Sequence, residues 1–492
     1  MSTWIKVSQF ISEKYLCLFN NMNRKPFLFA LSVLCCFQIF AQQGPWSLQQ
    51  CIEYAQKNNL QVKQSELGVK QSEITLLQNK AGILPTLNFN ANNFYNFGQT
   101  IDPFTNTFAT SRVRSDRYSL SAGITLFNGL QQYNSIRQSE MNNFASKLDL
   151  ERTRNDLALN IALAYLQVLF NAQQINIWKN QTGITKQQLA RTNTLIEAGS
   201  LAIAARYDLE AQLANEELQL VNANNSYDLA LLNLALQLDL KSTQGFSVLE
   251  PVLDEPHANM ISGNPDDYFV VAGKNHPSIK GAEMRVKAAQ TGLQIARGAQ
   301  LPTFTMGGSI GSGYSGAAKD VVGYDPEQIQ IGSTQLGDKV FATRQNPILE
   351  STPYDKQLNS NFNKSFGFQL SMPLFNGLSN YAGIQRAKVG VSNAELNLET
   401  AKRDLRSNIA QAHNDAVAAL KKFEATRKAT DAAKQTYGNN EKRYNLGALS
   451  TFEFNDSKNR LTKAESDLLQ ARYDFFFRVK VLDFYQGKPL TL

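Results

Sequence analysis

The sequence predicts a mainly α-helical protein in which a long helical hairpin occurs twice, with a smaller β portion that contributes to a transmembrane barrel. Three observations support this fold class. Two segments, residues 128–240 and 376–487, contain no proline, and one short turn interrupts each of them. The two segments align without a gap, so that Gly199 falls on Gly447. Four stretches outside them alternate apolar and polar residues, which is the period of a β-strand.

The N-terminus has the pattern of a secretory signal. Two basic residues precede the short apolar run over residues 26–41, and cleavage is expected after Ala41, which gives a signal peptide over residues 1–41. Residues 1–21 are then an over-extended start. A lipoprotein signal ending at Cys35 or Cys36 is the alternative, disfavoured because no small residue precedes Cys35 and apolar chain follows both cysteines.

Cysteine count, charge distribution and hydropathy limit what the residues after the expected cleavage site can do. Cys51 is its one cysteine, which excludes an internal disulfide and favours a buried helical position. Basic residues are interspersed with acidic ones, so nucleic acid is not an expected partner. No apolar run after the leader reaches the roughly 20 residues of a transmembrane helix, so only strands could cross a membrane.

The first repeat is expected over residues 42–245. A helix over about residues 47–82 ends at Leu84-Pro85-Thr86, and strands are predicted at 86–97 and 116–127 with a polar loop between them. A long helical hairpin with its tip at Gly199 follows. The apolar face of the second strand consists of Tyr118, Leu120, Ala122, Ile124 and Leu126.

The second repeat is expected over residues 265–488, after a linker over residues 246–264 and before a C-terminal tail over 489–492. It has the same plan, with a helix, strands at 303–314 and 362–374, and a hairpin with its tip at Gly447. A long polar loop is expected between its strands. Leu301-Pro302-Thr303 matches the corresponding motif of the first repeat.

Strands with one apolar face fit either a transmembrane barrel or a sheet covered by helices. The barrel is favoured because the flanking helices have coiled-coil seams and therefore partners of their own. Four strands cannot close a barrel, for which about eight is the practical minimum. Several copies must therefore combine their strands, and the sequence leaves open whether two or three do so.

The duplicated order of these motifs resembles the TolC family of outer-membrane efflux channels. The resemblance rests on the paired Leu-Pro-Thr and Leu-Phe-Asn-Gly junctions and on tips with the sequences Glu-Ala-Gly-Ser-Leu-Ala and Tyr-Asn-Leu-Gly-Ala-Leu-Ser, and it extends from about Trp46 to Leu490. It implies a homotrimer with one 12-stranded barrel in the outer membrane of a Gram-negative bacterium and a helical tunnel in the periplasm. A periplasmic adaptor and an inner-membrane transporter are the implied partners in efflux or type I secretion, without a cofactor.

The resemblance also implies two sets of functional residues. The periplasmic constriction would use Tyr444, Glu453, Asp456 and, in the first repeat, Asp208. The adaptor-docking tips would use Gly199, Leu201, Ala202, Gly447, Leu449 and Ser450. The first repeat has Ala205 where the second has Glu453, and Leu449 replaces a basic residue often found in the family. Ser450 and Glu453 also fit a capping box, so capping and pore-lining both remain open for Glu453.

Two other functions compete with a channel. The stretches 307–311 and 311–316 match the G-x-S-x-G and G-x-G-x-x-G patterns of hydrolases and dinucleotide-binding proteins, but they lie at a strand end that leads into a loop. The histidines His257, His276 and His413 lack metal-ligand spacing. A periplasmic coiled-coil scaffold or adaptor is the second alternative, although it would not need four strands with one apolar face. The sequence predicts a protein that is not an enzyme.

Overall fold

The computed structural model describes residues 44–490 except 103, 107, 110–111, 252–254, 262 and 489. The expected signal peptide and most of the expected tail lie outside these residues. The chain divides into two compact units. The hairpin unit comprises Ile161–Asp254 with the chain up to Ala55, and the sheet unit comprises Gln56–Asn160 and Glu255–Leu490.

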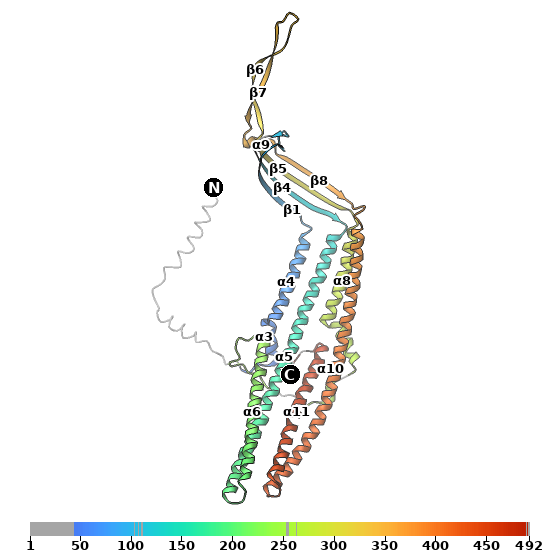
Figure 1. Cartoon of the computed structure of the whole chain (residues 1–492). Coiled ribbons are helices and arrows are strands. Elements are labelled where there is room, and N and C mark those ends of the chain that lie inside the picture. Colours follow the sequence, from blue (N-terminus) through green and yellow to red (C-terminus); the bar gives the residue numbers. More distant parts are fainter. Residues whose placement is uncertain are drawn as a thin grey trace, which may run out of the picture. The chain divides into compact units, whose positions relative to one another are not determined.

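In its described part, the sheet unit contains a four-stranded antiparallel sheet in the order β1-β4-β5-β8 (Figure 1). The strands are β1 (Thr86–Asn96), β4 (Val113–Asn128), β5 (Thr303–Ser315) and β8 (Asn363–Ser371). Because β4 and β5 pair in the centre, strands from both repeats form one sheet, and β1 and β8 are its edges. The predicted combination of four strands with duplicated long helical hairpins is confirmed.

The strand register places apolar residues on one face of the sheet and small polar residues on the other. Residues directly opposite each other in an antiparallel pair share a face. Two rows of the apolar face are Leu87, Ala122, Gly308, Phe366 and Phe89, Leu120, Ile310, Lys364. A row of the polar face is Asn88, Ser121, Ser309 and Ser365, in which the hydroxyl oxygens of Ser309 and Ser365 are 2.8 Å apart.

The segment expected as a long polar loop in the second repeat contains regular structure. It forms a two-stranded ribbon of β6 (Lys319–Ser333) and β7 (Lys339–Ser351), followed by the short helix α9 (Tyr354–Ser360). The loop of the first repeat contains the two-residue strands β2 (Thr100–Ile101) and β3 (Phe108–Ala109). Both strands of the ribbon are exposed along most of their length. A strand that buries neither face does not need the alternation of apolar and polar residues by which a half-buried strand is recognised.

Each strand pair leads into a long helix through a left-handed turn. Gly129 and Leu130 have φ of +64° and +62°, and the equivalent Gly377 and Leu378 have +61° and +63°. Glycine is required at position 129 for a second reason, because a Cβ there would lie 2.2 Å from the carbonyl oxygen of Gly298. The Leu-Phe-Asn-Gly motif therefore marks a backbone conformation shared by the two repeats.

The hairpin of the second repeat consists of α10 (Ser379–Asn445) and α11 (Thr451–Tyr485). Apolar residues from these helices and from α7 (Pro265–Asn275) and α8 (Pro277–Gly298) form a core that includes Tyr268, Ile279, Leu405, Ile409 and Leu482. Figure 1 shows α10 running alongside α8 and paired with α11. In the described ranges, no helix carries an apolar stretch long enough to cross a membrane.

The helix expected over residues 47–82 is two helices. They are α3 (Leu48–Asn58) and α4 (Leu60–Ala81), and Asn59 caps α4 by accepting a hydrogen bond from the Gln61 amide at 2.8 Å. The second repeat breaks at the equivalent His276, which caps α8 before Pro277. In the second repeat Pro277 cannot continue the preceding helix, so a new helix begins there. Asn59 and His276 each cap the helix that follows the break.

The hairpin unit contains the end of α5 (Gln131–Glu197), paired with α6 (Ala204–Gln237). Its buried apolar residues include Ile161, Leu209 and Leu234. Glu216 is also buried, and its carboxylate accepts hydrogen bonds from Thr185 and from Gln212, the latter at 2.8 Å. A buried acid is tolerated here because hydroxyl and amide donors replace its hydration.

Candidate functional site at the hairpin tips

Both hairpin tips end their first helix with the same hydrogen-bonded turn. Gly199 and Gly447 have φ of +73° and +72°. The Ser200 amide donates to the Leu195 carbonyl at 2.8 Å, and the Ala448 amide donates to the Arg443 carbonyl at 2.9 Å. Together with the glycine amides, which bond to residues three earlier, these contacts form a Schellman motif. Glycine is needed because other residues are strained at this φ.

The second tip starts its returning helix with a capping box. The Ser450 hydroxyl accepts from the Glu453 amide, and the Ser450 amide donates to the Glu453 carboxylate, both at 3.2 Å. Hydrogen bonds from the Ser450 hydroxyl and amide lower the pKa of Glu453, because they favour the ionised carboxylate. The capping role of Glu453 is thus present in the structure, and its pore role stays a prediction.

The first tip lacks this side-chain cap. Helix α6 has Ile203 at its N-cap, and that residue makes no side-chain capping bond. Ala202 and Ala205 occupy the places of Ser450 and Glu453, so neither the hydroxyl nor the carboxylate of a capping box is available. Leu201 and Ile203 are exposed at this tip. The two tips therefore differ in chemistry although their turns share one backbone geometry.

Tyr444 belongs to an aromatic cluster between α10 and α11. Its ring stacks on Phe454 with centroids 4.5 Å apart and planes inclined by 13°. Tyr437 contacts the same phenylalanine at 5.6 Å between centroids, and Phe454 is 1% exposed. Burial raises the pKa of Tyr437 to about 12, with a further contribution from Glu441. Tyr444 is thus positioned by a packed partner from the other helix of its hairpin.

The remaining acids are exposed. The carboxylate of Asp456 forms an ion pair with Arg460 one turn later, at 2.9 Å. Asp208 is exposed on α6 in the hairpin unit, whereas Tyr444, Glu453 and Asp456 all belong to the sheet unit. The structure thus brings three of the four expected constriction residues to one tip region within one unit.

Sequence reasoning missed several residues around the second tip. Phe454 orients Tyr444, and Leu446 and Phe452 are exposed by 84% and 81%. Two apolar side chains on a polar turn are a signal that could have identified them, because exposed large apolar residues that cluster indicate contact surfaces.

The residues of the hydrolase pattern lie in a strand, and those of the dinucleotide pattern lie in the same strand except Gly316, which follows its end. Residues 307–311 are inside β5, and Ser309 has a serine of β8 as its neighbour. A nucleophile elbow requires a sharp turn from a strand into a helix, and β5 continues instead to Ser315. His276 caps a helix, and His413 Nε2 lies 3.2 Å from the Gly263 carbonyl oxygen.

Comparisons with known proteins agree with this architecture. The family model described as outer membrane efflux protein matches residues 51–238 and 270–476. The outer membrane protein TolC of Vibrio cholerae is 23% identical over 73% of this chain and 75% of its own length. The alkaline protease secretion protein AprF of Pseudomonas aeruginosa is 21% identical over 83% of this chain and 77% of its own.

A solved structure shows the same fold. The outer membrane protein VceC of Vibrio cholerae superposes with a TM-score of 0.69 at 15% identity, covering 90% of this chain and 96% of that one. Because the family model matches both repeats, the chain belongs to the outer membrane efflux protein family and is an outer-membrane channel of an efflux or secretion system.

Proposed function

We propose that three copies of this chain form one passive channel, which takes substrates from a periplasmic adaptor and an inner-membrane transporter to the cell exterior. The observation that carries the proposal is the sheet with one apolar face and two edge strands, β1 and β8. Unpaired strand edges are not tolerated in lipid, because no water is present to bond their backbone groups. Pairing of β8 with β1 of the next copy would close the barrel.

The polar face of the sheet supports three copies over two. Side chains fill the interior of an eight-stranded barrel, whereas a larger barrel leaves room for water. The inward rows carry Asn88, Ser121, Ser309 and Ser365 and a neighbouring row of Thr86, Gly123, Gly307 and Gly367. These small, uncharged residues are suited to a water-filled lumen. Twelve strands would provide one.

We infer that the hairpin tips dock onto the adaptor. Leu201 and Ala202 at the first tip, and Leu449 and Ser450 at the second, flank the two glycine turns. Exposed Leu446 and Phe452 add apolar surface at the second tip. Tyr444, Asp456 and Asp208 would line a constriction, and Glu453 would contribute charge to it while capping α11. The carboxylates would favour cations in the narrow part of the pore.

The copy number is tested by the mass of the purified mature protein in detergent. Three chains per particle are expected, and a stable monomer or dimer would contradict the proposal. The constriction is tested by single-channel conductance of the combined variant Asp208→Asn, Glu453→Gln and Asp456→Asn. Its cation selectivity should fall. The matched control, Asp325→Asn, Asp338→Asn and Glu350→Gln, removes the same charge from the β6–β7 ribbon, and equal effects of the two sets would refute the assignment.

A further inference from the structure

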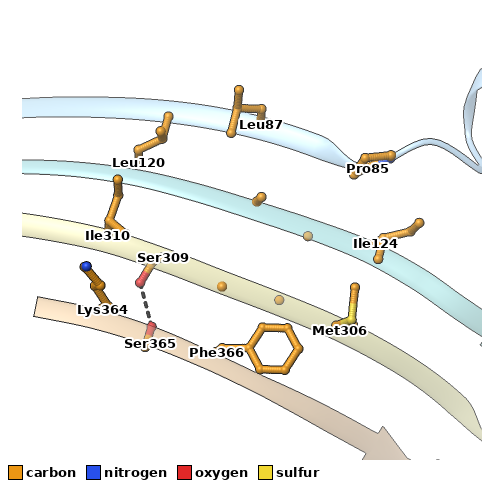
Figure 2. Close-up of a pocket in the computed structure, with 14 residues that line it drawn as sticks. Pro85, Leu87, Leu120, Ile124, Met306, Ser309, Ile310, Lys364, Ser365 and Phe366 are labelled. Atoms are coloured by element: carbon orange, nitrogen blue, oxygen red, sulfur yellow. Dashed lines mark hydrogen bonds between the residues drawn. The ribbon is translucent and has the colours of Figure 1, made fainter.

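The apolar face of the sheet contains a hollow of about 370 Å³ (Figure 2). Ala122 of β4 and Gly308 of β5, which pair directly, lie at its base. Ala122 has only a methyl group and Gly308 has no side chain, whereas their neighbours along the same face have large side chains. The hollow therefore arises from two adjacent small residues in the middle of an otherwise bulky apolar surface.

Large apolar side chains surround this base. The pair Leu120 and Ile310 lies on one side of it and the pair Ile124 and Met306 on the other, as Figure 2 shows. Leu87 of β1 and Phe366 of β8 border it across the strands. Ile310 and Met306 are four residues apart on one strand, which corresponds to a length of ~13 Å. The hollow is thus long, narrow and apolar, as an extended hydrocarbon chain is.

A single cation lies at one end of the hollow. Lys364 pairs with Ile310 on the apolar face and is among the residues that line the hollow. It is the second residue of β8, at the strand end remote from the long helix α10 and next to the short helix α9. Its ammonium lies over the Phe362 ring, 5.3 Å from the centroid, beyond the start of the strand. Among the described residues, no carboxylate pairs with Lys364.

A charged lysine on a lipid-facing strand is unfavourable unless its ammonium reaches the interface. The direction of Lys364 toward Phe362 satisfies this requirement, because it extends the side chain toward the outer end of the strand. The ammonium then lies at the depth of lipid headgroups, directly above an apolar hollow of acyl-chain shape. Lysine is a common ligand of phosphate groups.

We propose that the hollow and Lys364 together bind a phosphate-bearing membrane lipid, with one acyl chain over Ala122 and Gly308 and the phosphate on the Lys364 ammonium. A chain seated in the hollow has protein atoms on three sides, so it gains more dispersion contacts than a lipid on a flat part of the face. The site depends on the outer-membrane location of the sheet. It does not depend on the number of copies or on the tunnel.

The acyl part is tested by native mass spectrometry of the mature protein in detergent, titrated with dipalmitoyl phosphatidic acid. Ala122→Leu fills the hollow with an apolar side chain on a lipid-facing position, and it should weaken binding about tenfold, an effect well within what a lost apolar contact costs. Ala91→Leu is the matched control, since Ala91 lies on the same face but does not line the hollow. Equal affinities of the two variants would overturn the proposal.

The headgroup part is tested with Lys364→Gln, an exposed substitution that folding should tolerate. It should weaken phosphatidic acid about fivefold and leave dipalmitoylglycerol, which lacks phosphate, unchanged, as expected for one lost ionic contact. Lys339→Gln on the β6–β7 ribbon should change neither. Displacement of the lipid by millimolar inorganic phosphate would show an anion site without an acyl seat and would refute the proposal. The conductance experiment reports on the channel separately.

Discussion

Tyr444 and Phe454 stack face to face across the second hairpin, with ring centroids 4.5 Å apart. Tyr444 is the residue that the family resemblance places in the constriction, and Phe454 is its buried partner on the returning helix. The pair links the position of the Tyr444 hydroxyl to the packing of the hairpin. Structural and conducting roles of this tyrosine can therefore be separated by substitution.

Phe454→Ala should lower the local stability of the tip by about 3–5 kcal/mol, the usual cost of truncating a buried phenylalanine. Amide hydrogen exchange at the α10–α11 tip measures this as a lower free energy of opening. Tyr444→Phe keeps both rings and removes only the hydroxyl, so it should leave exchange unchanged and alter single-channel conductance. Faster exchange in Tyr444→Phe would show that the hydroxyl has a structural role instead.

The capping box gives a second prediction. Ser450→Ala should destabilise the start of α11 by about 1 kcal/mol, because it removes an N-cap hydroxyl. Glu453→Gln should have a smaller effect on exchange, since glutamine also completes a capping box. If Ser450→Ala exchanges as the wild type does, the box contributes nothing.

The lowered pKa of Glu453 determines in which direction the stability of the second tip changes with pH. A carboxyl whose folded pKa is depressed stabilises the fold above its unfolded value, here 4.5, and loses that contribution as the pH falls through the folded pKa. The free energy of opening at the α11 start, obtained from amide exchange after correction for the pH-dependent intrinsic rates, should therefore fall below pH 4.5 in the wild type and less so in Glu453→Gln. A parallel response of both proteins would assign the effect to other groups.

Substitution of the turn glycines tests the docking role of the tips. Gly199→Val and Gly447→Val place a β-branched residue at φ near +72°, which strains each turn by at least about 1–2 kcal/mol. Binding of a periplasmic adaptor should weaken, whereas insertion of the barrel should be unchanged. Gly438→Val is the control, because Gly438 lies inside α10 with open space around its Cβ position. Normal efflux by both tip variants would contradict the docking assignment.

The sequence predicted features that leave a periodic or duplicated pattern. The gap-free alignment of the two halves placed Gly199 on Gly447, and the structure gives both the same left-handed φ. Strand alternation gave the apolar face that contains Leu120 and Ala122. These features depend on local backbone preference and on one-sided burial, which a single sequence records directly.

Features that depend on contacts between distant segments could not be predicted. Phe454 follows Tyr444 by ten residues across a turn, and no spacing rule indicates that their rings stack. The β6–β7 ribbon is exposed on both faces and so lacks an apolar period. The hollow over Ala122 and Gly308 requires the register between strands of different repeats, which pairing alone reveals.

The break between α7 and α8 provides the last prediction. His276 caps α8 as Asn59 caps α4, but its ring is half-buried beside Phe484 and Tyr485. Burial lowers the pKa of His276 below its ordinary 6.5, and Asp156 on α5 partly opposes this shift. Burial also raises the pKa of Asp156, while Arg152 and Glu151 act on the histidine with opposite signs.

A histidine with a depressed folded pKa stabilises the protein above its unfolded pKa, and this contribution is lost as the pH falls through the folded value. The free energy of opening at the α7–α8 break, obtained from amide exchange after correction for the pH-dependent intrinsic rates, should thus fall between pH 7.5 and 5.5 in the wild type. His276→Asn copies the cap of the first repeat without a titrating ring, and its free energy of opening should be nearly independent of pH in this window. Asp156 is present in both proteins, and the substitution removes the lowering effect that His276 exerts on the Asp156 pKa. An equal fall of the opening free energy in His276→Asn would show that another group, and not the imidazole, senses the pH at this break.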